Sequence, residues 1–400
     1  MKMNDFMKLM LAAVIAFPSC EILDNDEDKH IMDKHQTHIS LSEVSQILSS
    51  IPITQKQVRE VYDAVTASSG NGYDEEYTMK NLFSAPGSGV GDKATRAAGS
   101  YDQPLSRLIE EHVKSIAGTR SSVDMSVDRM GVDGFLQALE ESDIQIYWPF
   151  SERHSSDRLP IITFDPEDGS EVNVGYRFSI NDDGFRQVEE VIVDEGMAAE
   201  VPVWVINRNS DAGYSTLEML RREDPEWGEG GGTIIVKPLG AVTRSDKPLK
   251  TLLLKNFVMK RQYDSWFAGA SEFFVKTGYV EDFTASTEAE LRLYNPTVTD
   301  FMVVFRRNEV GKPVPFNAIL VSELTDQLTH CAMMITEDDG GTITKWDCQA
   351  LVRVESKSYG IEISLPFNSR DDIVWRGQLA TKWFENNNNV TGHFGDVDLT

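Results

Sequence analysis

The hydrophobic period of the sequence changes near Ile144, and this change constrains the fold more than any other feature. Before Ile144, apolar residues recur three and four positions apart, as in the series Leu41, Val44 and Leu48, which predicts amphipathic helices. From Ile144 onward, apolar and polar residues alternate, which is the period of a strand with one buried face. We therefore expect an α+β fold that is mostly β, with its helices near the N-terminus.

The N-terminal part of the chain carries local helix signals. Thr54, with Gln57 three positions later, forms a capping-box pattern, in which each side chain can accept the other residue's backbone N–H. A further helical pattern covers residues 105–118. Between these segments, residues 84–100 are small and polar, which predicts a linker or a long loop. We interpret this part as a helical region with flexible loops.

Short apolar segments between polar turns fill the rest of the chain. In the middle region, these segments predict a strand-rich α+β structure. They are 144–148, 161–164, 176–180, 188–193, 201–206 and 234–236, with one short helix over 216–223. About eight further segments follow without a strong helix, which favours an antiparallel β-sandwich, for which C2-like domains are one model, and leaves a barrel as the alternative. They are 252–257, 272–276, 291–294, 302–306, 318–321, 332–336, 350–354 and 361–365.

The length of 400 residues allows for more than one domain, and the patterns above divide the chain accordingly. The expected parts are a signal peptide over 1–20, an acidic tether over 21–39, a helical region over 40–142, a strand-rich region over 143–245 and a β-sandwich domain over 249–400. The final residues, 398–400, follow a strand pattern, which leaves room for a longer natural chain.

The first twenty residues have the layout of an export signal. A positive start precedes the apolar run 9–17, which is too short to cross a bilayer as a helix. Cys20 follows, and this order resembles the lipobox signals of bacterial lipoproteins, whose Cys is lipidated. Ser19 matches the lipobox pattern, whereas Phe17-Pro18 departs from it. We expect cleavage before Cys20 and lipidation there; ordinary signal-peptidase cleavage is the alternative.

The balance of charge is strongly acidic. The chain has 38 Lys and Arg against 64 Asp and Glu, a net charge of −26, so it repels nucleic acid and anionic membrane surfaces. Many carboxylates are left for solvent or for divalent cations. The acidic stretch 21–28 resembles the surface-export signal of Bacteroidetes lipoproteins. We therefore expect contact with the membrane through the lipid anchor only, and no nucleic acid partner.

Two further cysteines remain after Cys20 is set aside. Cys331 and Cys348 are centred on Asp339-Gly340, a dipeptide typical of tight hairpin turns. If this dipeptide forms the turn, the two cysteines face each other across the hairpin. Outside the cytoplasm a disulfide can form there, and two buried thiols are the alternative.

Acidic turns in the C-terminal part suggest a metal site. Asp338 and Asp339 lie in one turn, and Asp371 and Asp372 lie in another. Calcium takes six to eight oxygen ligands, which converging acidic loops can supply. We therefore treat these four residues as candidate calcium ligands, with exposed turns as the alternative reading.

The sequence contains no catalytic motif. It lacks the Gly-x-Ser-x-Gly nucleophile elbow, and its histidines do not have the helical spacing of zinc proteases. Trp266 and Trp375 could each stack on a sugar or pack in a core. We therefore assign no catalytic residue, and no cofactor other than calcium.

A family resemblance rests on four features: the signal, the tether, and the segments 264–273 (DSWFAGASEF) and 371–377 (DDIVWRG). Together they resemble the uncharacterised surface lipoproteins of gut Bacteroidetes, and the resemblance covers most of the chain. It implies a lipid-anchored place at the outer membrane, on the cell surface. It implies no activity.

The combination of strands and acidic loops without a catalytic constellation favours a non-enzymatic role. Our first hypothesis is a binding or interaction module with a glycan or protein ligand. The second is a secreted hydrolase that uses carboxylates or calcium. The third is a structural subunit of a surface fibre.

Overall fold

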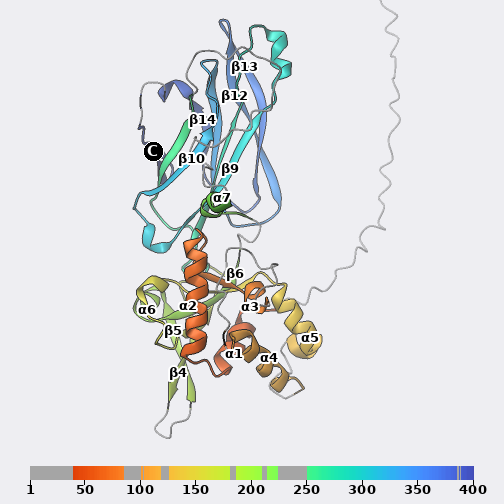
Figure 1. The fold of residues 1–400 in the computed structure, drawn as a ribbon, viewed down its shortest axis with the longest axis vertical. Coiled ribbons are helices and arrows are strands. Elements are labelled where there is room, and N and C mark those ends of the chain that lie inside the picture. The colour runs from red at the N-terminus through yellow and green to blue at the C-terminus, as the bar shows by residue number, and fades with distance from the viewer. Residues whose placement is uncertain are drawn as a thin grey trace, which may run out of the picture. The chain divides into compact units, whose positions relative to one another are not determined.

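The structure is a computed structural model, and it describes residues 39–84, 101, 103–118, 126–180, 186–209, 214–223, 250–384, 387 and 389–400. The signal peptide with Cys20, nearly all of the tether and the candidate strand 234–236 lie outside these residues. The protein is mostly β, with antiparallel sheets and with most of its helices near the N-terminus (Figure 1). The expected fold class is therefore confirmed.

The described residues from 39 to 209 form the N-terminal lobe, which is built on a six-stranded sheet. Its strand order is β1-β2-β6-β3-β4-β5, and all neighbours are antiparallel except β3 and β6. The strands are β1 (Glu76–Thr78), β2 (Ile144–Tyr147), β3 (Ile161–Phe164), β4 (Val172–Ile180), β5 (Arg186–Asp194) and β6 (Val203–Arg208). The helices are α1 (Leu41–Ser50), α2 (Gln55–Gly70), α3 (Met79–Phe83), α4 (Leu105–Ile116), α5 (Ser126–Glu140), α6 (Glu195–Glu200) and the 3-10 helix η3 (Ser151–Arg153).

Helices and strands of this lobe share one hydrophobic core. Val44 of α1 lies in it together with Ile146 of β2 and Trp204 of β6, and all three are buried. The ring of Trp148 meets that of Trp204 edge-on, with centroids 6.1 Å apart. The expected helical and strand-rich regions therefore fold as one body.

The capping box at the start of α2 is confirmed. The backbone N–H of Thr54 donates to Gln57 Oε1 at 2.9 Å, and the N–H of Lys56 donates to Thr54 Oγ1 at 3.3 Å. These bonds satisfy N–H groups that the first turn of a helix leaves without helical partners. After α2 the chain turns toward Asp74, which contacts the C-terminal lobe.

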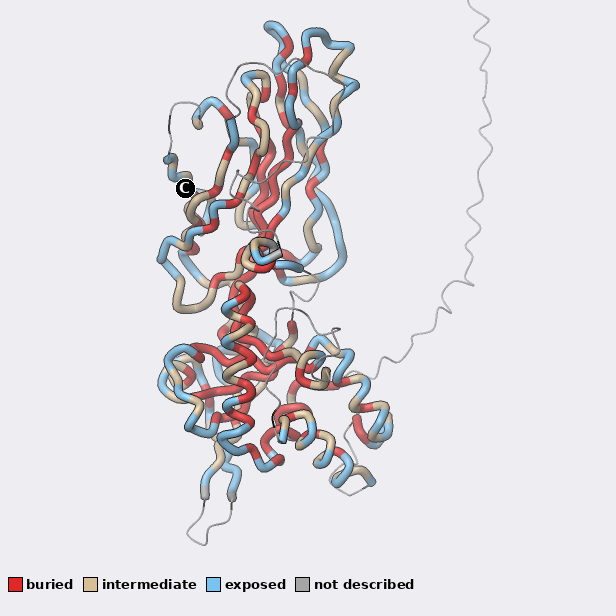
Figure 2. Tube along the Cα trace, in the orientation of Figure 1, coloured by how far each residue is buried: buried red, intermediate tan, exposed pale blue. Residues whose placement is uncertain are grey.

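The described residues from 250 onward form the C-terminal lobe, in which two antiparallel sheets enclose one core. One sheet has the order β10-β7-β16-β15, and the other has β13-β12-β11-β8-β9 with β14 paired to β11. Phe257 of the first sheet packs against Phe273 and Phe305 of the second, at centroid distances of 5.2 and 4.6 Å. Buried residues follow the strands of this core (Figure 2). The lobe is an antiparallel β-sandwich.

The elements of the C-terminal lobe follow the helix α7 (Leu217–Glu223). They are β7 (Leu252–Met259), β8 (Ser271–Tyr279), η4 (Glu288–Leu293), β9 (Thr297–Phe305), η5 (Arg307–Glu309), β10 (Val314–Val321), β11 (Leu328–Glu337), β12 (Ile343–Val354), β13 (Lys357–Asn368), β14 (Asp372–Ala380), η6 (Thr381–Trp383), β15 (Gly392–Phe394) and β16 (Val397–Leu399). No helix among the described residues is both long and apolar enough to cross a membrane.

Two parts of this lobe differ from the sequence-based expectations. Residues 291–294 were expected as a strand, but they lie in the 3-10 helix η4 and at its end, where Leu293 is exposed. A short apolar segment does not by itself distinguish a strand from a helical turn. The strands β14 and β15 were not expected, because β14 lacks strict alternation and β15 is only three residues long. The strand pattern at residues 398–400 corresponds to β16.

Candidate functional site

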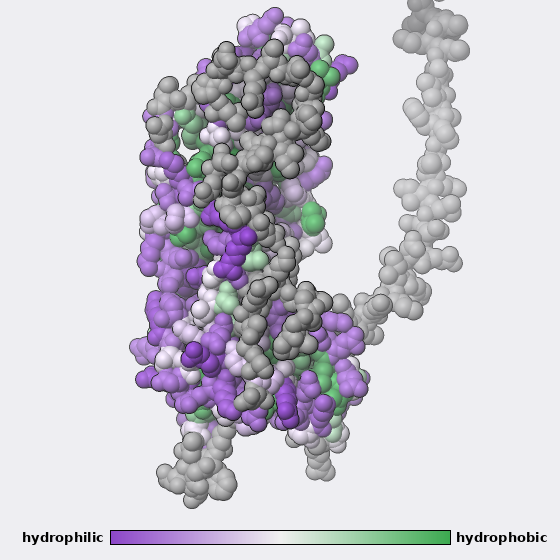
Figure 3. All heavy atoms as spheres, viewed as in Figure 1, coloured by the Kyte–Doolittle hydropathy of each residue, from purple (hydrophilic) through white to green (hydrophobic). Residues whose placement is uncertain are grey.

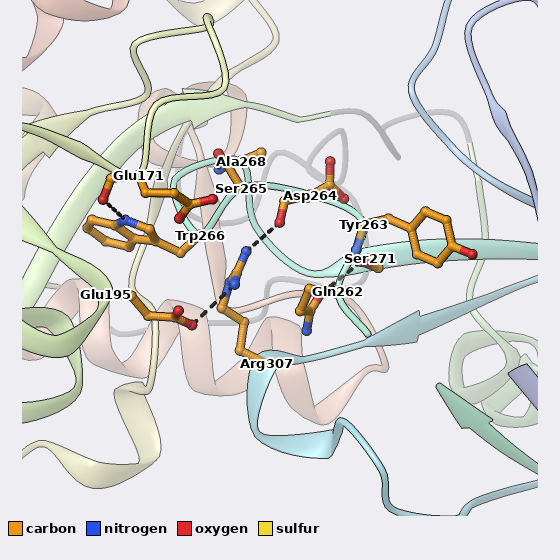
Figure 4. A network of polar contacts seen from close by, with 10 residues as sticks. All are labelled: Glu171, Glu195, Gln262, Tyr263, Asp264, Ser265, Trp266, Ala268, Ser271 and Arg307. Carbon is orange, nitrogen blue, oxygen red and sulfur yellow. Dashed lines mark hydrogen bonds and ion pairs between the residues drawn. The ribbon is translucent and has the colours of Figure 1, made fainter. Parts of the chain in front are cut away.

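The connection from β7 to β8, residues 260–270, inserts two aromatic side chains into the N-terminal lobe; we call it the connecting loop. Trp266 and Phe267 are fully buried and lie in an apolar cluster with Val205 of β6. The Trp266 indole N–H donates to the carbonyl of Glu171 at 2.9 Å (Figure 4). Because its ring is enclosed, Trp266 is a packing residue and cannot serve as a platform for a sugar.

The backbone of the connecting loop is bonded directly to the N-terminal lobe. Asn207 Nδ2 donates to the carbonyl of Phe267 at 3.1 Å, and Asp74 Oδ2 accepts the N–H of Ala270 at 2.9 Å. Gly269 between them has φ 133°, and a Cβ at this position would lie 2.9 Å from Asp74 Oδ2. Only glycine fits this approach of backbone to carboxylate.

Two arginines after β9 extend this contact. Arg306 Nη2 donates to the carbonyl of Tyr73 at 3.3 Å. Arg307 donates from Nη1 to Glu195 Oε1 at 3.1 Å and from Nη2 to the carbonyl of Asp264 at 2.7 Å (Figure 4). The side chain of Arg307 is only 8% exposed, so salt screens its ion pair less than it would an exposed pair.

Three carboxylates gather where the connecting loop meets the sandwich. Asp264, Glu272 and Glu337 each place one oxygen within 4.8 Å of the others, and we call them the three-carboxylate group. Pairing of β8 with β11 brings the glutamates together, since the N–H of Asp338 donates to the Glu272 carbonyl at 2.9 Å. Glu272 is 6% exposed and Glu337 is 1% exposed.

The electrostatics of the three-carboxylate group are those of crowded, buried acids. Burial raises the pKa of Glu337 to about 11, with added contributions from the nearby carboxyl of Asp264 and the charges of Asp339 and Asp372. Burial likewise raises the pKa of Asp264 to about 6, against the lowering effects of Glu337 and Arg307. Both shifts mean that the charged form is disfavoured at this place in the fold.

The expected calcium ligands lie beside this group. The turn with Asp338 and Asp339 meets the turn with Asp371 and Asp372, as expected for converging loops at one end of a sandwich. The N–H of Asp339 donates to Asp371 Oδ1 at 3.4 Å, and Asp372 lies opposite Glu337 in the pairing of β11 with β14. The structure therefore brings the two turns together.

The carboxylates of Asp338 and Asp371 serve to close the two turns. Asn368 donates its backbone N–H to Asp371 Oδ2 and its side-chain amide to Asp338 Oδ1, each at 2.8 Å. The N–H of Gly340 donates to the same Asp338 oxygen at 3.1 Å. Across the described ranges, the group of three or more carboxylates close enough to share one metal ion is the three-carboxylate group.

The cysteines do not form the expected pair. Cys331 and Cys348 are free thiols, and the prediction that they face each other across a hairpin is wrong. In the observed register, Cys331 lies opposite Leu379 of β14, whereas Cys348 lies opposite Ile363 of β13. The strands β11 and β12 pair only from Leu328 to His330, because β8 occupies the same edge of β11 from Ala332 to Glu337.

A cavity of about 430 Å³ lies in the C-terminal lobe, between the four-stranded sheet and the segment around η6. Its walls are mainly aliphatic and aromatic, with Leu254 and Leu320 from the sheet, Leu379 from β14, and Trp383 and Phe384 from η6 and the residue after it. This volume falls within the range of small-ligand pockets. We call it the apolar pocket.

The mouth of the apolar pocket presents an aromatic side chain to solvent. Trp383 lines the pocket and is nevertheless 67% exposed, which is unusual for so large an apolar group. Among the residues that Figure 3 colours, most are hydrophilic, and the hydrophobic ones lie in separate small areas. Among the other lining residues, Gln378, Thr391 and Thr400 supply polar side chains.

The site residues that the sequence did not indicate are Asp264, Glu272 and those of the apolar pocket. Asp264 and Glu272 are separated in sequence from Glu337 by more than sixty residues, so only the strand pairing joins them.

Comparison of the chain with protein-family models, with curated proteins and with solved structures finds no match.

Proposed function

We propose that this protein is an exported, lipid-anchored surface protein that binds apolar side chains of a protein ligand in the apolar pocket. The observation that carries the proposal is the exposed Trp383 at the mouth of a cavity of about 430 Å³ whose walls are mainly apolar. Large exposed aromatic groups beside an apolar cavity are typical of recognition sites.

A protein ligand fits this pocket better than a glycan does. A sugar requires several hydrogen-bonding groups around an aromatic face, whereas Gln378 and Thr391 are among the few polar side chains in the lining. Gln378 already donates its amide to the carbonyl of Gln349 at 2.9 Å. Apolar side chains, in contrast, gain from leaving water without needing such partners.

The binding proposal is tested with a fluorescent apolar dye, anilinonaphthalene sulfonate, and panels of apolar peptides and glycans. We expect the dye to bind the wild-type protein, apolar peptides to displace it, and Trp383→Ala to weaken both by at least about fivefold. Leu293→Ala is the matched control, since Leu293 is 76% exposed and is not part of the pocket. Binding of glycans but not peptides at this pocket would contradict the proposal.

The export proposal rests on the signal layout around Cys20 and on the acidic tether. Lipid labelling of cells that express the full chain should mark the wild-type protein and not Cys20→Ala. A lipid-labelled Cys20→Ala protein would show that the anchor lies elsewhere.

A further inference from the structure

We propose that Asp264, Glu272 and Glu337 bind a calcium ion at the base of the connecting loop. This inference is independent of the apolar pocket. The first observation behind it is geometric: one oxygen of each carboxylate lies within 4.8 Å of the others. Calcium–oxygen distances of about 2.3–2.6 Å allow two oxygens on one ion to be up to about 5 Å apart.

The second observation is that Glu337 lacks hydrogen-bond donors. Its side chain is 1% exposed, and neither carboxylate oxygen accepts a hydrogen bond within the part of the chain that the structure describes. Asp264 Oδ2 is likewise buried and without a donor there. A buried carboxylate oxygen without a donor is costly, so nearly all such groups in native proteins have a partner. The oxygens of Glu337 need one, and the nearest polar atoms include other carboxylates.

The charges around Glu337 also favour a cation. The ionisable groups that act on it are acids, namely Asp264, Asp339 and Asp372. Arg307 acts on Asp264, but its guanidinium is already bonded to Glu195 and to a carbonyl. Within the described ranges, no Lys, Arg or His forms an ion pair with Glu337. The ionised form of Glu337 would therefore have no neighbouring cationic side chain among the described residues to balance its charge, and a bound cation would supply that balance.

The chemistry of the ligands selects calcium among the common metal ions. All three donors are carboxylates, which suit hard cations, and no His or Cys belongs to the group. Magnesium usually keeps several of its water ligands, and the small exposure of Glu272 and Glu337 leaves little room for water. Calcium accepts irregular, bidentate carboxylate ligation, and this is what a loop and two strand ends can offer.

The site would join elements that are distant in sequence. Asp264 belongs to the connecting loop, which carries Trp266 into the N-terminal lobe, whereas Glu272 and Glu337 belong to paired strands of the sandwich. A bound ion would therefore fix the connecting loop to the sandwich. Its loss should loosen the connecting loop and, with it, the attachment of Trp266.

The alternative to a cation is a proton shared between Asp264 and Glu337. Such a pair would satisfy one oxygen of each residue without metal, and it would be insensitive to calcium. Calcium and a proton can thus be distinguished by titration at constant pH. The two models also differ in their response to Glu337→Gln, which keeps a group that can donate to Asp264 but cannot offer an anionic oxygen to a metal ion.

The experiment uses the full chain, stripped with EGTA, and follows thermal unfolding and calorimetric titration with calcium. At about 10 mM calcium we expect Tm to rise by at least about 2 °C, and a single site in the titration. Glu337→Gln and Asp264→Asn should abolish both effects while remaining folded in EGTA. Glu60→Gln, which changes a buried acid of the N-terminal lobe, should keep the full calcium response.

Several outcomes would overturn the inference. A wild-type Tm that does not respond to calcium would leave the shared proton as the explanation. An equal response of wild type and Glu337→Gln would place any calcium elsewhere, and loss of the response only in Asp371→Asn would move it to the neighbouring turns. A response to magnesium but not to calcium would overturn the choice of ion.

Discussion

Two buried glutamates, one in each lobe, show how differently a fold can treat the same side chain. Glu60 of α2 is 2% exposed and Glu337 of β11 is 1% exposed. Glu60 accepts the backbone N–H of Leu105 at 2.8 Å and the hydroxyl of Tyr77 at 3.4 Å. Glu337 has no such donors among the described residues and lies among acids instead. The pKa values follow this difference.

Burial raises both pKa values, but to different extents. The pKa of Glu60 reaches about 7, because the two hydrogen bonds partly offset the effect of burial. The pKa of Glu337 reaches about 11, because the neighbouring carboxyl groups add to the effect of burial. Two carboxylates that are buried to the same depth therefore differ because one has hydrogen-bond donors that offset the cost of burial and the other has none among the described residues. This difference also indicates that Glu337 is the residue to examine for an external partner.

The largest expected effect is that of Glu60→Leu, which removes the hydrogen-bonded carboxylate of the pair. It leaves the N–H of Leu105 and the hydroxyl of Tyr77 buried without their acceptor, and we expect the free energy of unfolding to fall by about 4 kcal/mol. Urea unfolding measures this loss. Glu111→Leu, at an exposed position of α4, should change it by less than about 0.5 kcal/mol.

The next effect is a dependence of the free energy of unfolding on pH, which arises from the titration of Glu60. Its pKa is higher in the folded protein than its ordinary value of 4.5, so the stabilisation is fully present below about pH 4.5 and is lost as the pH rises toward 7. The total loss is about 3 kcal/mol. The difference in unfolding free energy between wild type and Glu60→Gln should change by this amount across that window. A difference that stays constant with pH would show that Glu60 titrates normally.

A smaller effect is expected for Asp371→Asn, in the turn next to Glu337. The carboxylate accepts the N–H of Asn368 at 2.8 Å, and the amide oxygen of Asn can still accept this bond. We therefore expect a loss of about 1 kcal/mol, the difference between a charged and a neutral acceptor. A loss above about 3 kcal/mol in urea unfolding would mean that the Asp371 charge has a partner as yet unassigned.

The smallest effect is expected for Glu337→Gln in calcium-free solution at neutral pH. With a pKa of about 11, this carboxyl is already neutral under those conditions, and the amide of Gln can donate to Asp264. The free energy of unfolding should change by less than about 1 kcal/mol. Urea unfolding in EGTA measures it. A loss of unfolding free energy similar to that of Glu60→Leu would contradict the conclusion that Glu337, unlike Glu60, lacks stabilising hydrogen bonds.

The sequence predicted those parts of the fold that depend on local pattern. The capping box of Thr54 and Gln57 is an interaction within one helical turn, so its residues could be recognised directly. The alternation after Ile144 likewise indicated strands. The segment 291–294 failed because a few apolar residues fit more than one local structure, and the environment of the segment decides between them.

The candidate sites depended on information that local pattern does not contain. The turns with Asp338 and Asp371 could be expected to meet, but the hydrogen bonds from Asn368 that engage them could not. Asp264 and Glu272 join Glu337 only through the pairing of β8 with β11. The same long-range register separates Cys331 from Cys348, although their symmetric spacing suggested a hairpin.

The two thiols of the sandwich have a consequence for how the folded protein meets oxidants and thiol reagents. Burial raises the pKa of Cys331 to about 12 and that of Cys348 to about 11, so very little thiolate is present at neutral pH. Thiolate is the form that attacks disulfides and reacts with oxidants. In the folded sandwich both thiols should therefore react slowly with thiol reagents at neutral pH. The fully buried Cys331 should react more slowly than the half-buried Cys348, and unfolding in urea should make both react rapidly.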